Sequence, residues 1–324
     1  DMAACGIEWV VMEVSAHALY YGKVDGIHFA YCIFTNLTED HLDFFKTMER
    51  YGAAKRKLFE GEGCGCAILN FDDEEGRALA SVARRSVSYA LENPSDVFAV
   101  DIAEGFDGCR YIINLFDELY EIRLHMTGRH NVYNSMAAAE CAKLIGIPVS
   151  VIAEGLASLE KVSGRLERAG TYRGADIFVD FAHTPDGLEK SLRALRPHCR
   201  GRLICLFGCG GNRDAQKRPL MGEVAAKYAD FVVLTSDNPR YEDPFDIVLQ
   251  IEKGVKTQTN EYVIVVDRES AIEYAVDKLC EGDVLLVAGK GGENYQEIMG
   301  VKHIYSDFSA IRSILKYKAA ERDG

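Results

Sequence analysis

The sequence has 324 residues, of which 48% are apolar and 27% are charged, as in ordinary globular proteins. Its net charge of −13 argues against a nucleic-acid partner, and no stretch is long and apolar enough to insert into a membrane. The length favours about two domains, each able to bury its own core.

The ten cysteines are scattered along the chain and form no C-x-x-C pair with the spacing of a zinc site. Several lie within apolar runs, such as residues 203–207, and no signal peptide precedes them. We therefore expect buried free thiols in a reducing cytoplasm, and favour this interpretation over a disulfide framework.

The first half alternates short apolar runs with helical stretches. The expected strands are 9–14, 30–35 and 66–70, and the expected helices are 47–59, 73–83, 131–145 and 150–159. Residues 86–126 predict a mostly β stretch, with runs at 86–90, 97–102 and 111–115. The run Trp9-Val10-Val11-Met12 follows Asp1 so closely that we expect a fragment whose first domain begins upstream.

The second half alternates strictly between apolar, strand-length runs and helix-compatible sequence. The runs are 177–181, 203–207, 231–235, 263–266 and 284–287. This pattern predicts β-α-β units on a parallel sheet, with ligands bound at the carboxyl ends of the strands. Val162-Ser163-Gly164 is a plausible linker. We therefore expect one domain at 1–162 and a second at 163–324.

Polar residues gather directly after three of these strands. The loops at 208–214, 236–240 and 289–293 carry Arg213, Asp237, Arg240 and Glu293. The carboxyl ends of parallel strands meet at one edge of a sheet, so we expect these side chains on one rim. Such a rim suits a small molecule that bears both carboxylates and amines.

Two of these loops are rich in glycine. The loop at 208–211 lacks the third glycine of a dinucleotide motif, because Arg213 stands there. The loop at 289–292 resembles a phosphate loop only superficially, since G-x-x-x-x-G-K-[ST] is absent from the sequence. Both loops could simply be tight turns, which explains the glycines but not the charged residues beside them.

Two further places could carry chemistry. Glu13 at a strand end and His41 in the next loop could form half of a magnesium site, although such residues are more often solvated. Asp180 ends the run at 177–181 and is followed by His183, for which a general-base role has no supporting spacing. Thr184-Pro185-Asp186 is suited to begin a helix.

Taken together, nine ordered blocks resemble the Mur ligase family, in particular its branch that adds meso-diaminopimelate. The blocks are MEVSAHAL (12–19), FTNLTEDHLDFF (34–45), YGAAKRKLF (51–59), GRHNVYNSMAAA (128–139), SGRLER (163–168), VDFAHTPDGLEK (179–190), FGCGGNRDAQKRPLMG (207–222), TSDNPRYEDP (235–244) and GKGGENYQ (289–296). They span nearly the whole chain. DNPR at 237–240 is the most specific, because in this family it marks the diaminopimelate-adding branch.

The resemblance implies an α/β chain with an incomplete Mur-ligase central domain followed by a Rossmann-like C-terminal domain. It implies a cytoplasmic, ATP- and Mg²⁺-dependent ligase of peptidoglycan precursor synthesis. ATP would phosphorylate the D-glutamyl carboxylate of UDP-N-acetylmuramoyl-L-alanyl-D-glutamate, and the amine of meso-diaminopimelate would attack the acyl phosphate. It leaves the oligomeric state open.

The resemblance also assigns residues to roles. Glu13, His41 and a carbamylated Lys55 would be the catalytic and magnesium-binding residues. The ATP-binding residues would be Asn131, Arg165 and Asp180, and those on the side of the UDP precursor would be Ser15 and Lys23. The diaminopimelate-binding residues would be Arg213, Asp237, Asn238, Arg240, Gly289 and Glu293.

The sequence departs from the family pattern at Ala16, His130 and Gly292, where serine, phenylalanine and histidine are usual. Lys23 also stands where arginine is commoner. The phosphate loop that precedes residue 12 in the family is absent, so we expect this chain alone to be an inactive fragment. Two alternatives stay open: a ligase of the same superfamily for another amino acid, and a non-catalytic relative that binds a ligand or partner.

Overall fold

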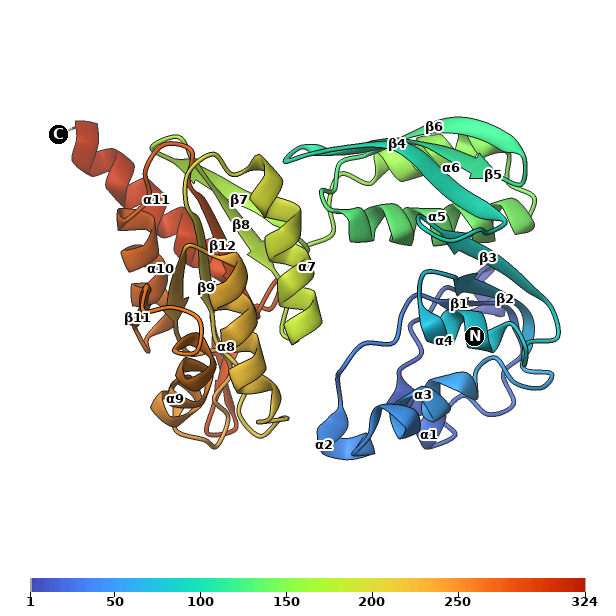
Figure 1. Ribbon diagram of the computed structural model, residues 1–324, viewed down its shortest axis with the longest axis horizontal. Helices are drawn as coiled ribbons and strands as arrows, with labels where there is room; N and C mark the ends of the chain where they lie inside the picture. The colour runs from blue at the N-terminus through green and yellow to red at the C-terminus, as the bar shows by residue number, and fades with distance from the viewer. Residues whose placement is uncertain (1, 324) are drawn as a thin grey trace.

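The computed structural model describes residues 2–323, which fold into two α/β halves (Figure 1). Each half is built on a six-stranded sheet. Short segments between residues 158 and 167 connect the last helix of the first half to the first strand of the second. None of the helices within residues 2–323 has the length and apolar character needed to cross a membrane.

The sheet of the first half has the strand order β1-β2-β3-β4-β5-β6. Its strands are β1 (Phe29–Phe34), β2 (Cys64–Asn70), β3 (Ser86–Ala90), β4 (Val97–Gly105), β5 (Gly108–Leu115) and β6 (Glu118–Leu124). Its helices are η1 (Ala3–Cys5), α1 (Ala16–Tyr20), α2 (Leu42–Phe45), α3 (Met48–Arg56), α4 (Glu74–Leu79), α5 (Arg129–Leu144) and α6 (Val149–Ser158). The strands β1–β4 are parallel, and β4–β6 are antiparallel.

The antiparallel part folds as its sequence predicts, because β5 alternates buried and more exposed residues. Its buried face, which includes Tyr111 and Ile113, packs against Val132 and Met136 of α5. The strand β6 lies within the predicted β stretch of 86–126, but no separate run was assigned to it, since its exposed residues Glu118–Glu121 give little apolar signal.

The predicted strand at 9–14 is wrong. This segment carries no strand pairing, and Val11 is 97% exposed. The strand β1 forms the outer edge of its sheet, and within residues 2–323 no strand lies beside that edge. An apolar run becomes a buried strand only when a neighbouring strand supplies hydrogen bonds and covers its side chains.

The sheet of the second half has the order β11-β10-β9-β12-β8-β7, parallel except for the pair β7–β8. Its strands are β7 (Glu167–Tyr172), β8 (Ala175–Asp180), β9 (Leu203–Phe207), β10 (Phe231–Leu234), β11 (Tyr262–Ile264) and β12 (Val284–Ala288). Its helices are α7 (Pro185–Leu195), η2 (Arg196–His198), α8 (Lys217–Tyr228), α9 (Pro244–Val255), α10 (Arg268–Asp277) and α11 (Asp307–Asp323). A separate hairpin pairs β13 (Tyr295–Ile298) with β14 (Val301–Ile304).

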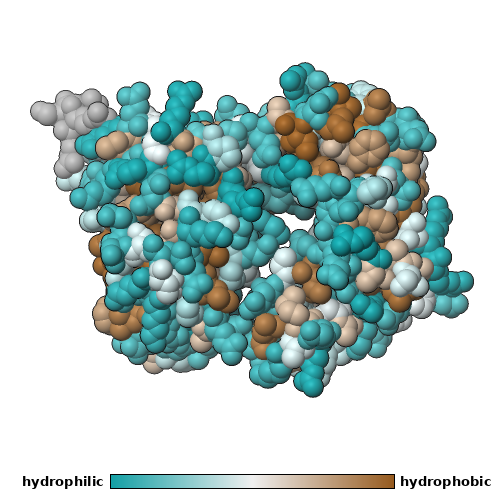
Figure 2. Space-filling model, viewed as in Figure 1, coloured by the Kyte–Doolittle hydropathy of each residue, from teal (hydrophilic) through white to brown (hydrophobic). Residues whose placement is uncertain are grey.

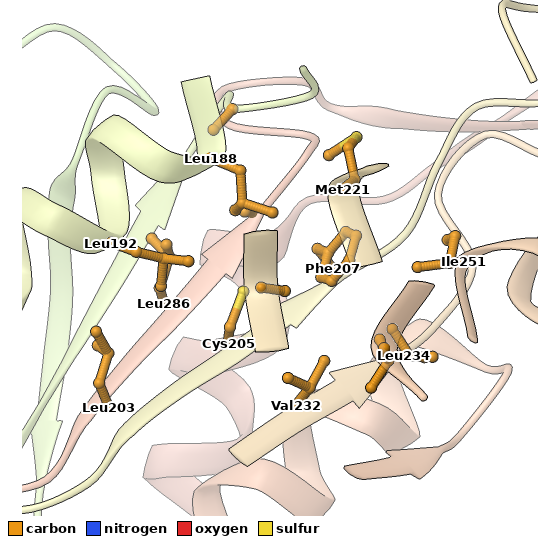
Figure 3. Close-up of a cluster of buried hydrophobic side chains, with 14 of the residues drawn as sticks. Leu188, Leu192, Leu203, Cys205, Phe207, Met221, Val232, Leu234, Ile251 and Leu286 are labelled. Carbon is orange, nitrogen blue, oxygen red and sulfur yellow. The ribbon is translucent and has the colours of Figure 1, made fainter. Parts of the chain in front are cut away.

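Helices cover both faces of this sheet, which explains its continuous apolar strands. On one face, α7, α8 and α9 pack over β9, β10 and β12; Leu192, Met221 and Ile251 meet Phe207 and its neighbours there (Figure 3). On the other face, α10 and α11 contribute Ile272 and Ile311 to a second core. Because helices pack on both faces of the sheet, the ends of the strands are fixed in position, and so are the loops that follow them.

Candidate functional site

Lys55 lies in the last turn of α3, a helix that begins after Thr47. Its Nζ donates a hydrogen bond to the carbonyl oxygen of Asn36 at 3.1 Å and lies 5.1 Å from the ring centre of Tyr51. Burial lowers the pKa of Lys55, and the carboxylates of Asp73, Asp40 and Glu13 oppose that shift. The amine therefore loses its proton more readily than a surface lysine, in a surrounding of carboxylate oxygens.

His41 lies beside this group, in a left-handed conformation (φ 58°) at the start of α2. Its Nε2 is 3.5 Å from Asp40 Oδ2, and its ring is 4.8 Å from that of His17. Burial lowers the pKa of His41; Asp40 opposes the shift, and Lys217 contributes to it. Since Lys217 belongs to α8, the His41 side of the first half faces the second half.

Glu13, Ser15 and Lys23 are exposed. The Ser15 hydroxyl accepts a hydrogen bond from the backbone N–H of Ala18 at 3.2 Å and so caps α1. Lys23 follows Gly22, which lines a hollow of about 530 Å³ next to β1. Among residues 2–323, no group of three or more His, Cys, Asp or Glu side chains is placed to hold a metal ion.

A cleft of about 750 Å³ lies between the two halves, and the space-filling view shows an opening between them (Figure 2). The first half lines the cleft with Asn70, Asp72 and Tyr133, among others, and the second half lines it with side chains of α7 such as Lys190 and Arg193. The cleft therefore offers polar groups of both charges from both halves.

The predicted ATP-binding residues meet around His130, which also lines the cleft. Burial lowers the pKa of His130; Asp180 opposes the shift, and Arg165 contributes to it, so both lie near the imidazole. The Arg165 guanidinium stacks on the ring of Phe181 at 4.7 Å. The next residue along α5, Asn131, is buried and donates from Nδ2 to the carbonyl of Thr127 at 2.8 Å.

Asp180 is buried, and both of its carboxylate oxygens accept hydrogen bonds from residues of the second half. Its Oδ2 accepts from the Leu166 N–H at 2.7 Å, and its Oδ1 accepts from the Ala182 N–H at 2.9 Å and the Ser191 hydroxyl at 2.8 Å. These bonds fix the segment that carries Arg165 against the end of β8. The following helix α7 begins as expected, because the Thr184 hydroxyl accepts from the Gly187 N–H.

The structure brings the three polar loops of the second half together, as the sequence predicts. We call residues 208–213, 236–240 and 289–293 the three-loop rim. The Gly211 N–H donates to the carbonyl of Asn238 at 2.9 Å, joining the first two loops. Gly289 has φ +111°, and a Cβ there would lie 2.6 Å from Asp237 Oδ2, so only glycine fits.

Asn238 is the centre of the rim. Its Nδ2 donates to Glu293 Oε2 at 2.9 Å, and its Oδ1 accepts from Lys290 Nζ at 3.1 Å and from the Glu297 N–H at 2.9 Å. Arg240 donates from Nη1 to the carbonyl of Gly211 at 2.8 Å. Its Nε lies 3.3 Å from a carboxylate oxygen of Glu297.

Arg213 is exposed, unlike Arg240. A Cβ on Gly210 would lie 2.9 Å from Arg240 Nη1 and 3.6 Å from Arg213 Cγ, so the two arginines flank this glycine. Glycine at this position therefore lets both cations reach the same part of the rim.

The rim also touches the linker between the halves. Gly164 has φ +68°, and a Cβ there would lie 2.0 Å from the backbone nitrogen of Gly292. A Cβ on Gly291 would lie 2.8 Å from the carbonyl oxygen of Gly164. The predicted linker is thus packed directly on the third loop of the rim.

Sequence reasoning missed four residues that organise the rim: Arg218, Arg268, Lys290 and Glu297. The side chains of Arg218, Arg268 and Lys290 are almost completely buried. Basic residues are usually exposed to solvent, so the sequence did not indicate their burial. The only available signal was the position of basic residues next to strand-end loops. Lys290 in particular is held by protein side chains, so 289–292 is not a phosphate loop.

Two known protein families match most of the chain. The family described as the Mur ligase middle domain matches residues 1–142, and that described as the Mur ligase glutamate ligase domain matches residues 164–291.

Individual relatives give the same result. The chain is 42% identical over 319 residues to a protein of Caldanaerobacter subterraneus named UDP-N-acetylmuramoyl-L-alanyl-D-glutamate–2,6-diaminopimelate ligase, covering 98% of this chain and 65% of the relative. A Syntrophomonas wolfei protein of the same name is 42% identical over 327 residues, covering 98% of this chain and 66% of the relative. The chain thus spans about two thirds of these relatives.

Solved structures agree in fold. A structure of a 2,6-diaminopimelate ligase of that name aligns with a TM-score of 0.64 and 31% identity, covering 98% of this chain and 66% of the other. A MurF ligase from Thermotoga maritima in complex with ADP aligns with a TM-score of 0.69 and 18% identity, covering 95% and 66%, and supports the fold alone.

Proposed function

This chain belongs to the Mur ligase family, and we propose that it is the larger part of a cytoplasmic ligase that joins meso-diaminopimelate to UDP-N-acetylmuramoyl-L-alanyl-D-glutamate. In this proposal residues 1–162 form the central domain and residues 163–324 the amino-acid-binding domain. The observation that carries the proposal is the three-loop rim. There Asn238 Nδ2 donates to Glu293, and Arg240 donates to the carbonyl of Gly211 in the adjoining loop. The relatives at 42% identity are named for the same two substrates.

The chemistry is amide formation through an acyl phosphate. The D-glutamyl carboxylate takes the γ-phosphoryl group of ATP, and ADP is released. The neutral amine then attacks the carbonyl carbon, and inorganic phosphate leaves as the nitrogen loses a proton and the amide forms. Asn131, Arg165 and Asp180 would hold ATP at the cleft between the halves, where His130 meets both Arg165 and Asp180. Ser15 and Lys23 would face the UDP precursor from the exposed side of α1.

The Lys55 group fits a magnesium site. Glu13 and His41 would hold Mg²⁺ together with Lys55 as a carbamate, and the ion would offset the charge of the phosphates. The lowered pKa of Lys55, caused by burial, supports this because only the neutral amine reacts with CO₂. The carboxylates of Asp40 and Asp73 lie near the same amine and add to the negative charge around it.

The three-loop rim would hold the far end of diaminopimelate. Arg240 and Arg213 would bind its second carboxylate, and Glu293 with Asp237 would bind its second ammonium. The absence of a side chain at Gly289 lets the Asp237 carboxylate keep its position, since a Cβ there would lie 2.6 Å from Asp237 Oδ2. Lysine lacks the second carboxylate and would leave the arginines unpaired, which disfavours it.

The test is ligation with magnesium-ATP and the UDP dipeptide precursor, comparing meso-diaminopimelate with lysine by product mass. The chain is assayed alone and joined to the N-terminal third of the Caldanaerobacter relative. Product from diaminopimelate but not lysine supports the proposal. Equal product from lysine indicates a ligase for another amino acid, and no product from either form of a folded protein indicates a non-catalytic relative.

A further inference from the structure

Three basic side chains are almost completely buried beneath the three-loop rim: Arg218, Arg268 and Lys290. Arg218 is paired with Glu242, and Arg268 is paired with Asp307. These two arginines also donate to backbone carbonyls of the rim and its supporting strands.

Lys290 differs, because both of its hydrogen bonds go to side chains assigned to the amino-acid pocket. Its Nζ donates to Asn238 Oδ1 at 3.1 Å and to Glu293 Oε2 at 3.0 Å. The ammonium has no exposed surface, and it lies 5.6 Å from the ring centre of Tyr295. A buried ammonium requires a partner of opposite charge, so Lys290 and Glu293 depend on each other.

The hydrogen bonds to Glu293 leave one of its two carboxylate oxygens available to a ligand. Its Oε2 accepts from both Lys290 Nζ and Asn238 Nδ2. Its Oε1 accepts no hydrogen bond from any residue in the range 2–323, and the side chain stays 23% exposed. The carboxylate is therefore held rigidly on one side and open on the other.

We propose that Lys290 is a positioning residue of the amino-acid pocket, which fixes the Glu293 carboxylate so that Oε1 binds the second ammonium of diaminopimelate. This inference rests on the function proposed above. Lys290 itself does not touch the amino acid in this arrangement; it acts through Glu293. Losing Lys290 leaves the Glu293 carboxylate held by Asn238 Nδ2 alone and removes one of the two donors to Asn238 Oδ1.

The discriminating ligand is 2-aminopimelate, which keeps both carboxylates but lacks the second ammonium. KM and kcat are measured for both amino acids in the joined ligase described above, for the parent, Lys290→Met, Glu293→Gln and the double variant. Lys290→Gln serves as a second neutral variant if Lys290→Met does not fold. Lys302→Met is the matched control, since Lys302 is exposed and lies over the same Tyr295 ring at 4.0 Å.

We expect Lys290→Met to raise KM for diaminopimelate by about tenfold or more, with kcat changed less than about threefold and KM for 2-aminopimelate unchanged. The KM for diaminopimelate should rise no more in the double variant than in Glu293→Gln alone, because both substitutions act on one contact. Three results would overturn the inference and leave the proposed function standing. They are an unchanged KM for diaminopimelate in Lys290→Met, an equal rise in KM for both amino acids, and a rise in the double variant that multiplies those of the two single variants. A parent that ligates neither amino acid overturns the proposed function and the inference with it.

Discussion

Arg268 and Asp307 form a two-point ion pair in which Nε–Oδ1 and Nη2–Oδ2 are both 2.8 Å long and both side chains are buried. Arg268 also donates to the carbonyls of Ser236, the first residue of the second loop of the three-loop rim, and Ala288, which precedes the third loop. The pair therefore ties the start of α11 and the ends of β10 and β12 to one guanidinium.

Replacing Arg268 with Met should destabilise the protein strongly, because it leaves the Asp307 carboxylate buried and uncompensated. Breaking such a pair typically costs about 3–5 kcal/mol. Urea unfolding measures the difference. The control is Arg84→Ala, whose pair with Glu62 is largely exposed and should change the free energy of unfolding by about 1 kcal/mol or less. Similar small losses in both variants would contradict the structural role of the buried pair.

Glu140 predicts a pH dependence of stability. It lies on α5 without exposure, and neither of its carboxylate oxygens has a hydrogen-bond partner within the described residues. Burial raises its pKa from 4.5 to about 8, with a smaller contribution from Asp96. The folded state therefore keeps the proton to a higher pH than the unfolded state does, and the stability gained from this is present below pH 4.5 and is lost as pH rises to about 8.

We expect Glu140→Gln to flatten the fall in unfolding free energy between about pH 4.5 and 8 and to stabilise the protein at pH 8 by a few kcal/mol, on the order of 1.4 per pKa unit removed. Urea unfolding across this range checks the result. Glu154→Gln, on the exposed side of α6, is the control and should keep the parent's slope. A parent slope that survives in Glu140→Gln would show that other groups cause it.

Arg240→Ala tests the recognition of the second carboxylate. We expect KM for diaminopimelate to rise by at least about tenfold with little change in kcat, since a charge-assisted contact made by bound substrate is lost. Steady-state ligation by the joined enzyme measures both constants. Arg312→Ala, on the exposed face of α11, is the control. An unchanged KM would remove Arg240 from the pocket.

Lys55→Ala tests the carbamate. Ligation should fall by about 100-fold or more, because the site loses an oxygen ligand that would help to neutralise phosphate charge. Carbon-13 NMR of the parent in labelled bicarbonate should show a carbamate signal that is absent from Lys55→Ala. The neighbouring exposed Lys57→Ala should keep both signal and activity. A fully active Lys55→Ala would contradict the role.

The sequence predicted the three-loop rim but not the side chains that stabilise it. Strand-length apolar runs each ending in polar residues placed Asp237 and Glu293 at one edge, because a parallel sheet gathers its carboxyl ends. The partners Lys290 and Glu297 were missed because they depend on tight turns and on the hairpin β13–β14, whose mixed residues carry little periodic signal. Which side chain a turn buries is set by three-dimensional packing.

The error at residues 9–14 has a similar cause. An apolar run such as Trp9-Val10-Val11-Met12 has strand propensity, but pairing needs a neighbour at the β1 edge. The site roles of Glu13, His41 and Lys55 likewise came from the resemblance, since a helix lysine and a loop histidine give no signal by themselves. The structure places Glu13 near enough to Lys55 to influence its pKa. The His41 ring and Lys55 Nζ both lie beside the ring of Tyr51, at 5.8 and 5.1 Å from its centre.

The contact of Gly164 with Gly291 and Gly292 joins the linker to the third loop of the three-loop rim. The chain therefore leaves the second half from a fixed point on the rim, and a rotation of one half against the other has to be absorbed by backbone on the first-half side of Gly164.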